Sequence, residues 1–203
     1  MTILTRRMMG VGAFAILFAS TFAAAQAPQV VRIRATIDSV DGQVLSAKGR
    51  DGAAMKIKVA EKAPVAQIVK ASLDDVTTGA YIAVTAMPQP DGSQKALAIY
   101  IFPQGVHPPD GFRPWDYSTG STMTNATVAD QVTAASGKTL TVKYKDGEKT
   151  IIVTPDTVIA TAKKASMADL KPGQKIFSAA AKRLDDGSYE VPNLSFGDYG
   201  VWR

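Results

Sequence analysis

The sequence predicts an all-β protein made of two tandem domains, each a small five-stranded barrel. Three features predict this fold. Apolar and polar residues alternate along many short segments, which is the pattern of half-buried strands. Asp-Gly pairs separate several of these segments, and such pairs favour hairpin turns. The same order of motifs occurs twice along the chain, which indicates a duplicated domain.

The composition limits the chemistry that is available. The chain has 203 residues, of which 46% are hydrophobic and 20% charged, as in folded globular proteins. It has no cysteine, which excludes disulfides, thiolate nucleophiles, cysteine zinc sites and iron–sulfur clusters. Its one histidine, His107, excludes a metal site built from several histidines.

Residues 1–27 have the pattern of a secretory signal peptide. A basic pair, Arg6 and Arg7, precedes an apolar stretch at 8–18 and a run of small residues. The Ala-x-Ala pattern allows cleavage after Ala25 or after Ala27. Without this segment the formal net charge falls from +5 to +3, because both arginines are lost. The periplasm is therefore the expected location, and no later apolar run is long enough to span a membrane.

The internal repeat predicts the domain boundaries. Lys70-Ala71-Ser72 recurs as Lys164-Ala165-Ser166, 94 residues later, and Asp91-Gly92-Ser93 recurs as Asp186-Gly187-Ser188, 95 residues later. Near the start of each copy, Ala35-Thr36-Ile37 resembles Ala126-Thr127-Val128. We therefore expect a first domain at 29–102, a linker at 103–121, a second domain at 122–197 and a tail at 198–203.

Each copy is expected to contain five strands. In the first, Val31, Ile33 and Ile37 alternate with polar residues, and turns at Asp41-Gly42 and Asp51-Gly52 divide the following strands. Segment 64–70 carries apolar residues at helical spacing and is expected to be a short helix. The strands expected are 31–40, 44–48, 55–59, 81–87 and 95–101 in the first copy, and 126–132, 139–144, 149–153, 176–183 and 189–194 in the second.

Five short strands with a longer connection between the third and fourth match an OB-like barrel. An immunoglobulin-like sandwich is the alternative, but it needs more strands and often a Cys–Trp–Cys core. The signal, the tandem copies and two segments, 123–130 (MTNATVAD) and 144–149 (YKDGEK), resemble small secreted proteobacterial proteins built from OB-like domains of unknown function. Relatives are often labelled metal transporter permeases, a label that a mature chain without a membrane span does not support. The resemblance implies fold and compartment and supplies no catalytic residues.

The linker differs in composition from both domains. It contains four prolines between 103 and 114, which favour an extended backbone. It also carries Phe112, Trp115 and Tyr117, and rings of this size seek burial or a binding partner. One interpretation is that these rings pack between the barrels and fix their orientation. The other is that they line a groove for a ligand or partner.

A second interpretation of the linker is a metal centre. His107, Asp110 and Asp116 lie within ten residues and carry side chains that can bind a metal ion. This triad predicts a metal-dependent enzyme or a metal-binding accessory protein centred on the linker. We keep it as the alternative function.

Basic residues raise the question of nucleic-acid binding, because OB barrels often bind single strands. The strands that flank the first hairpin of each copy carry lysines but almost no aromatic residues for base stacking, so the sequence disfavours nucleic acid. Anionic envelope polymers or headgroups fit the charge better. The six lysines are Lys56, Lys58, Lys62, Lys143, Lys145 and Lys149.

No catalytic constellation is apparent. The chain has no Gly-x-Ser-x-Gly motif, and its Asp residues stand mainly in turns, where the side chain bonds local backbone. We therefore expect no catalytic residues and no cofactor. The function expected is that of a periplasmic, non-enzymatic binding or scaffolding module, with an envelope protein, a polymer or a small ligand as partner.

Overall fold

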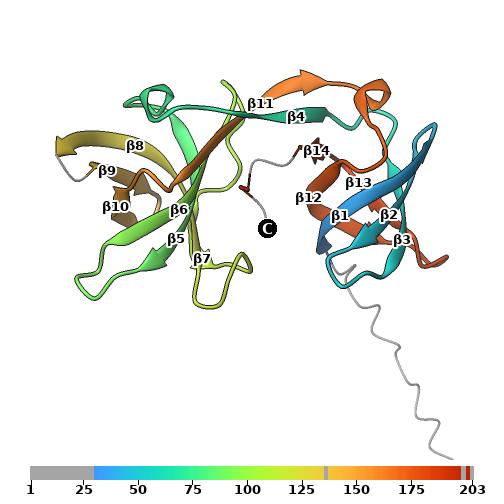
Figure 1. The fold of residues 1–203 in the computed structure, drawn as a ribbon. Helices are drawn as coiled ribbons and strands as arrows, with labels where there is room; N and C mark the ends of the chain where they lie inside the picture. Colours follow the sequence, from blue (N-terminus) through green and yellow to red (C-terminus); the bar gives the residue numbers. More distant parts are fainter. Residues whose placement is uncertain (1–29, 135–136, 198–199, 202–203) are drawn as a thin grey trace, which may run out of the picture.

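The computed structural model describes residues 30–134, 137–197 and 200–201 (Figure 1). The predicted signal peptide, residues 1–27, lies outside this part of the chain, and so does most of the predicted tail. The described residues form strands and two single-turn 3-10 helices but no α-helix, and no helix among them could cross a membrane. In chain order the elements are β1 (Val30–Asp41), β2 (Val44–Gly49), β3 (Ala54–Val59), β4 (Val65–Lys70), η1 (Leu73–Asp75), β5 (Tyr81–Pro88), β6 (Gln94–Ile101), β7 (Gly111–Pro114), β8 (Thr122–Ala134), β9 (Gly137–Tyr144), β10 (Gly147–Val153), β11 (Val158–Ala165), η2 (Met167–Asp169), β12 (Lys175–Arg183), β13 (Tyr189–Val191) and β14 (Leu194–Phe196).

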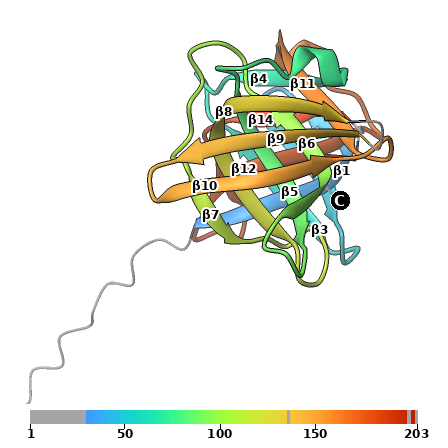
Figure 2. The same cartoon turned by 90° about the vertical axis from the view of Figure 1, so that its left-hand side faces the viewer.

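Two closed rings of five strands organise the molecule, so the prediction of an all-β barrel protein is confirmed. The first ring, barrel A, runs β1-β2-β3-β13-β12 and closes where β12 pairs with β1. The second, barrel B, runs β8-β9-β10-β6-β5 and closes where β5 pairs with β8. In each ring four pairings are antiparallel and one, β3–β13 or β10–β6, is parallel. Figure 1 shows the rings side by side, and Figure 2 faces barrel B.

Each barrel combines strands from both halves of the chain. Barrel A takes β1, β2 and β3 from the first half and β12 and β13 from the second, whereas barrel B takes β5 and β6 from the first half and β8, β9 and β10 from the second. This differs from the expectation of one self-contained barrel at 29–102 and another at 122–197. The pairing therefore exchanges the last two strands of each copy.

The exchange follows from the shape of the connections between the third and fourth strands. Both connections, β4 and β11, are extended and pair with each other antiparallel, from Val65 opposite Ala165 to Lys70 opposite Ala160. Each extended strand carries the chain away from the barrel it leaves and into the other barrel, as the bridge at the top of Figure 1 shows. β14 joins β4 and β11 joins β6, so the bridge continues the sheet on both sides.

The predicted helix at 64–70 is wrong, because this segment is β4. Its two buried side chains serve different cores. Val65 packs into the core of barrel A, and Ile68 packs with Ala160 under the bridge. A spacing of three residues suits a helix with a single apolar face, but here it reflects two separate contacts along one strand. The β-branched residues of the segment also favour a strand.

Three groups of buried side chains hold the molecule together. The core of barrel A joins Ile33, Ile37 and Ile57 from the first half to Ile176 and Phe196 from the second. The core of barrel B likewise joins both halves, and its residues include Ile82, Val84, Ile99, Val128, Leu140, Val142 and Ile151. The bridge core is Ile68, Ala98, Ala160 and Val201, with Tyr100 packed against it, and burial raises the pKa of Tyr100 to about 12.

Candidate functional site: a basic face beside the linker

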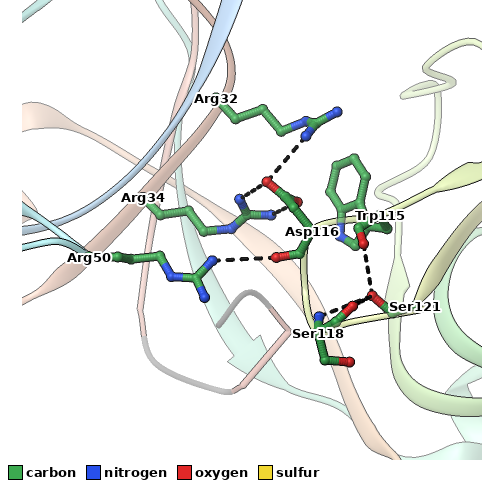
Figure 3. A network of polar contacts seen from close by, with 7 residues as sticks. All are labelled: Arg32, Arg34, Arg50, Trp115, Asp116, Ser118 and Ser121. Carbon is green, nitrogen blue, oxygen red and sulfur yellow. Dashed lines mark hydrogen bonds and ion pairs between the residues drawn. The ribbon is translucent and has the colours of Figure 1, made fainter.

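The linker packs against both barrels through strand pairing and ion pairs. Its strand β7 pairs antiparallel with the start of β8. The turn that follows is closed by the Trp115 N–H, which donates to the Ser121 carbonyl at 2.8 Å, and by the Ser121 hydroxyl, which donates to the Trp115 carbonyl at 2.9 Å. This turn directs Trp115 and Asp116 toward barrel A, as Figure 3 shows.

An ion-pair clamp joins the linker to β1. Both Nη atoms of Arg34 donate to the two carboxylate oxygens of Asp116 at 2.8 Å, and Arg32 adds a third contact at 3.2 Å (Figure 3). Two parallel bonds of this kind are among the stronger polar contacts in proteins. The Arg34 side chain is only 8% exposed, and the Asp116 carboxylate compensates a positive charge that is largely removed from water. The clamp therefore ties a linker carried by barrel B to the outer face of barrel A.

Trp115 lies among three guanidinium groups. The Cζ atoms of Arg32, Arg34 and Arg113 lie 4.2, 5.6 and 5.5 Å from the centre of its ring system. The negative face of an indole ring attracts such cations. Burial, and then the positive charge of Arg32, lower the pKa of Arg113. Three positively charged side chains therefore lie around the Trp115 ring, where the linker meets barrel A.

The structure does not gather the three predicted aromatic residues into one groove. Trp115 lies against the arginines of β1, whereas Tyr117 donates its hydroxyl to the Gly200 carbonyl at 2.8 Å. Phe112 lies on barrel B, 39% exposed, with the Lys149 ammonium 4.6 Å from its ring centre. Trp115 and Tyr117 are therefore half-buried against different partners, and Phe112 stands apart from both.

The three predicted metal ligands have other partners. His107 is exposed and lies edge-on to Tyr81, with the ring centres 4.9 Å apart. Asp110 accepts the Lys145 N–H at 2.8 Å, and Asp116 is held by Arg34. No three His, Cys, Asp or Glu side chains lie together as a metal site in residues 30–134, 137–197 and 200–201.

A basic groove beside the clamp is the main feature that the sequence did not single out. It has a volume of about 370 Å³, and all four of its charged lining residues are cationic: Arg34, Lys48, Arg50 and Lys175. The strand register explains the clustering, because Thr36 stands opposite Lys48 on one neighbouring strand and Lys175 on the other. Ala35, Thr36, Gly49 and Ile176 complete the lining.

Arg34, which lines this groove, has a donor without a hydrogen-bond partner among the described residues. Its Nε atom is buried and has no hydrogen-bond partner in the part of the chain described by the structure. Leaving such a donor unpaired costs about 1–3 kcal/mol. Arg50 is exposed and its Nη1 reaches the Asp116 carbonyl at 3.5 Å, whereas Lys48 forms an exposed pair with Asp38 at 3.5 Å. The groove therefore offers several positive groups to a negatively charged ligand.

The chain matches no protein-family model, no curated protein and no solved structure.

The clamp is expected to open in acid. Hydrogen bonds from Arg34, and its charge, hold the pKa of Asp116 below the ordinary value of an Asp side chain. A carboxyl whose pKa is lowered by folding stabilises the folded form above the unfolded pKa, about 3.9, and loses that effect as the pH falls through the folded pKa. In a Trp202→Phe background, Trp115 emission should shift to the red as the pH falls through the folded pKa of Asp116, which lies below the ordinary Asp value.

The matched variants make this test specific. Asp116→Asn should give red-shifted emission already at neutral pH. Asp186→Asn removes another carboxyl whose pKa is lowered, by Lys58 and Ser188, and should keep the acid transition of Trp115. The assignment to Asp116 is contradicted if Asp116→Asn and the parent show the same transition.

Proposed function

We propose that the protein is a non-enzymatic binding module of the bacterial envelope that takes an anionic ligand in the basic groove of barrel A. One observation carries the proposal: the charged residues that line the groove, Arg34, Lys48, Arg50 and Lys175, are all cationic. Arg34 is paired with Asp116 and Lys48 with Asp38, but the four cations outnumber these two carboxylates, so an anion bound in the groove is still attracted. The groove is therefore suited to a ligand with several negative charges.

The local geometry supports a bound ligand rather than a diffuse ion atmosphere. Arg34 is nearly buried and fixed by Asp116, so it contributes positive charge to the groove with little loss of side-chain entropy. Arg50 and Lys48 are exposed and can close over a ligand from β2 and the turn after it. One fixed cation and two exposed cations beside the same groove together favour recognition of an anion.

The finer fold assignment belongs to the same proposal. Numbering the strands of each copy from one to five, both rings run 1-2-3-5-4-1, with the parallel pairing between strands three and five. We assign both rings to the OB-like class, with strands four and five exchanged between the copies. The N-terminal pattern of residues 1–27 supports a periplasmic location.

Inorganic pyrophosphate is the probe that tests the groove. Titrated into the chain that begins at Pro28, it should shift the amide NMR signals of Thr36 and Gly49 in a saturable way. The double variant Lys48→Gln/Arg50→Gln should weaken binding at least about tenfold, or about 1.4 kcal/mol. Higher salt should weaken it further, because exposed charges are screened.

A matched control lies at the same place on barrel B. Lys143 stands opposite Thr127 as Lys48 stands opposite Thr36, and Lys145 follows two residues later as Arg50 does. All four side chains are exposed. Lys143→Gln/Lys145→Gln therefore makes the same change in net charge and should leave pyrophosphate binding within about twofold. Equal losses in both variants, or no saturable binding, would contradict the proposal.

A further inference from the structure

The two barrels differ at the start of their first strand. On barrel B, residues Thr122–Asn125 of β8 have a strand on each side, β5 on one and the linker strand β7 on the other. On barrel A, residues Val30–Arg34 of β1 pair with β12 only, and no other described strand lies along them. Barrel A therefore has an open strand edge where barrel B carries an added strand.

The strand register shows that these positions correspond. Ala35 stands opposite Ile176 on barrel A as Ala126 stands opposite Ile82 on barrel B. The residues before them, Arg34 and Asn125, hold the same place in their strands. Matched in the same way, Lys175 corresponds to Tyr81, and Arg50 corresponds to Lys145.

The linker shows how an extended peptide is held at this place on barrel B. Besides the pairing of β7 with β8, three hydrogen bonds fix the residues just before β7. The Tyr81 hydroxyl donates to the Pro108 carbonyl at 2.6 Å, and the Asn125 amide donates to the Pro109 carbonyl at 3.1 Å. The Lys145 N–H donates to the Asp110 carboxylate at 2.8 Å. Two of these anchors thus hold main-chain carbonyls, and the third holds a carboxylate.

Barrel A has cations where barrel B has neutral donors. Lys175 takes the place of Tyr81 and Arg34 takes the place of Asn125, and both line the basic groove. A guanidinium or an ammonium favours a carboxylate over a neutral carbonyl. One carboxylate, that of Asp116, already lies on this face of barrel A between Arg32 and Arg34, as Figure 3 shows. The charge of the face is therefore complementary to an acidic peptide.

We propose that the open edge of β1 at Val31–Arg34, together with the basic groove, binds an extended acidic peptide segment of a partner protein. The peptide adds as a strand antiparallel to β1, as β7 adds to β8. Main-chain hydrogen bonds supply affinity in this mode of recognition, and side-chain contacts supply specificity. The proposal rests on the proposed function, because it names the ligand class of the same groove.

The probe is a ten-residue peptide that has the sequence of linker residues 105–114 with two changes, His107→Asp and Arg113→Asp. It keeps Asp110 and the prolines that favour an extended backbone. A matched peptide has Asn at all three acidic positions. Fluorescence anisotropy with the chain beginning at Pro28 should show saturable binding of the acidic peptide and at least about tenfold weaker binding of the amide peptide.

Variants and hydrogen exchange locate the peptide. Lys48→Gln/Arg50→Gln should weaken peptide binding at least about tenfold, and Lys143→Gln/Lys145→Gln should change it by less than about twofold. Bound peptide should also slow amide hydrogen exchange at Val31–Arg34, because new strand pairing protects edge amides.

The outcomes separate this inference from the proposed function. If pyrophosphate binds the groove but the acidic peptide does not bind, or binds without protecting Val31–Arg34, strand addition is overturned and the anion site stands. If neither probe binds, both proposals fail. If the acidic and amide peptides bind equally well, the acidic specificity is overturned.

Discussion

Cutting the linker is expected to leave the two halves of the chain bound to each other. A protease site inserted between Gln104 and Gly105, in an exposed turn, separates β1–β6 from β7–β14 in the covalent chain. Each barrel still needs strands from both fragments, and each hydrophobic core is shared between them. Cores divided in this way resemble obligate interfaces, which do not come apart on dilution.

The measurement is size-exclusion chromatography with light scattering after complete cleavage. The cut protein should elute with the mass of the intact chain, and a denaturing gel should show two fragments. Adding denaturant should separate the fragments and unfold them in one step. Two fragments that elute separately and remain folded would instead support one barrel per copy, at 29–102 and 122–197.

The second large effect is expected from Phe196→Ala. Phe196 is 2% exposed and packs in the core of barrel A beside residues of β1, β2 and β3. Replacing a buried Phe with Ala costs about 3–5 kcal/mol in the free energy of unfolding. Hydrogen exchange should therefore speed up in β1, β2 and β3, although these strands lie more than a hundred residues earlier in the sequence.

The same variant should leave β8, β9 and β10 protected, because they belong to barrel B. Ile151→Ala is the matched control, since Ile151 is fully buried in the core of barrel B. It should loosen β5 and β6 of the first half and spare β1, β2 and β3. Faster exchange confined to residues 122–197 in Phe196→Ala would contradict the exchanged pairing.

The strands of the barrels could be predicted closely from local patterns. The alternation in 31–40 corresponds to β1, and the Asp51-Gly52 turn separates β2 from β3 as expected. These predictions succeed because apolar and polar residues alternate along a strand that is buried on one side of a sheet. The third to fifth strands of each copy lie close to the expected ranges, except that 189–194 forms two short strands, β13 and β14. The strand β5 departs from the period of two, because all its residues from Tyr81 to Ala86 are buried.

The partners of these strands could not be predicted in the same way. Two copies with the same strand order can close within themselves or exchange strands, and the alternating pattern is the same in both cases. The difference lies in the connections β4 and β11, and the apolar spacing in the first of them resembles that of a helix. An extended bridge is stabilised by pairing with its counterpart about 95 residues away, which no local window contains.

Only the linker part of the candidate site could be predicted from the sequence. The prolines and aromatic residues distinguish the linker in the sequence, and the spacing of His107, Asp110 and Asp116 predicts Asp116 as a metal ligand. Its true partner is Arg34, which is 82 residues away in the chain. The cations of the groove come from β1, β2 and β12 and the turn after β2, and each alone looks like an ordinary surface residue. The alternation that places Arg32 and Arg34 on one outer face was the available signal.

The exchange of strands also sets the order in which the protein can fold. All strands of barrel B lie between Tyr81 and Val153, so this barrel can close while the C-terminal segment is still free. Barrel A cannot close until residues 175–191 arrive, because Val30 pairs with Lys182 and β3 pairs with β13. Pairings between residues so distant in sequence form slowly. Barrel A therefore closes last, although its first three strands are synthesised first. A chain that stops before Lys175 contains all strands of barrel B, whereas β1 and β3 lack their partners β12 and β13.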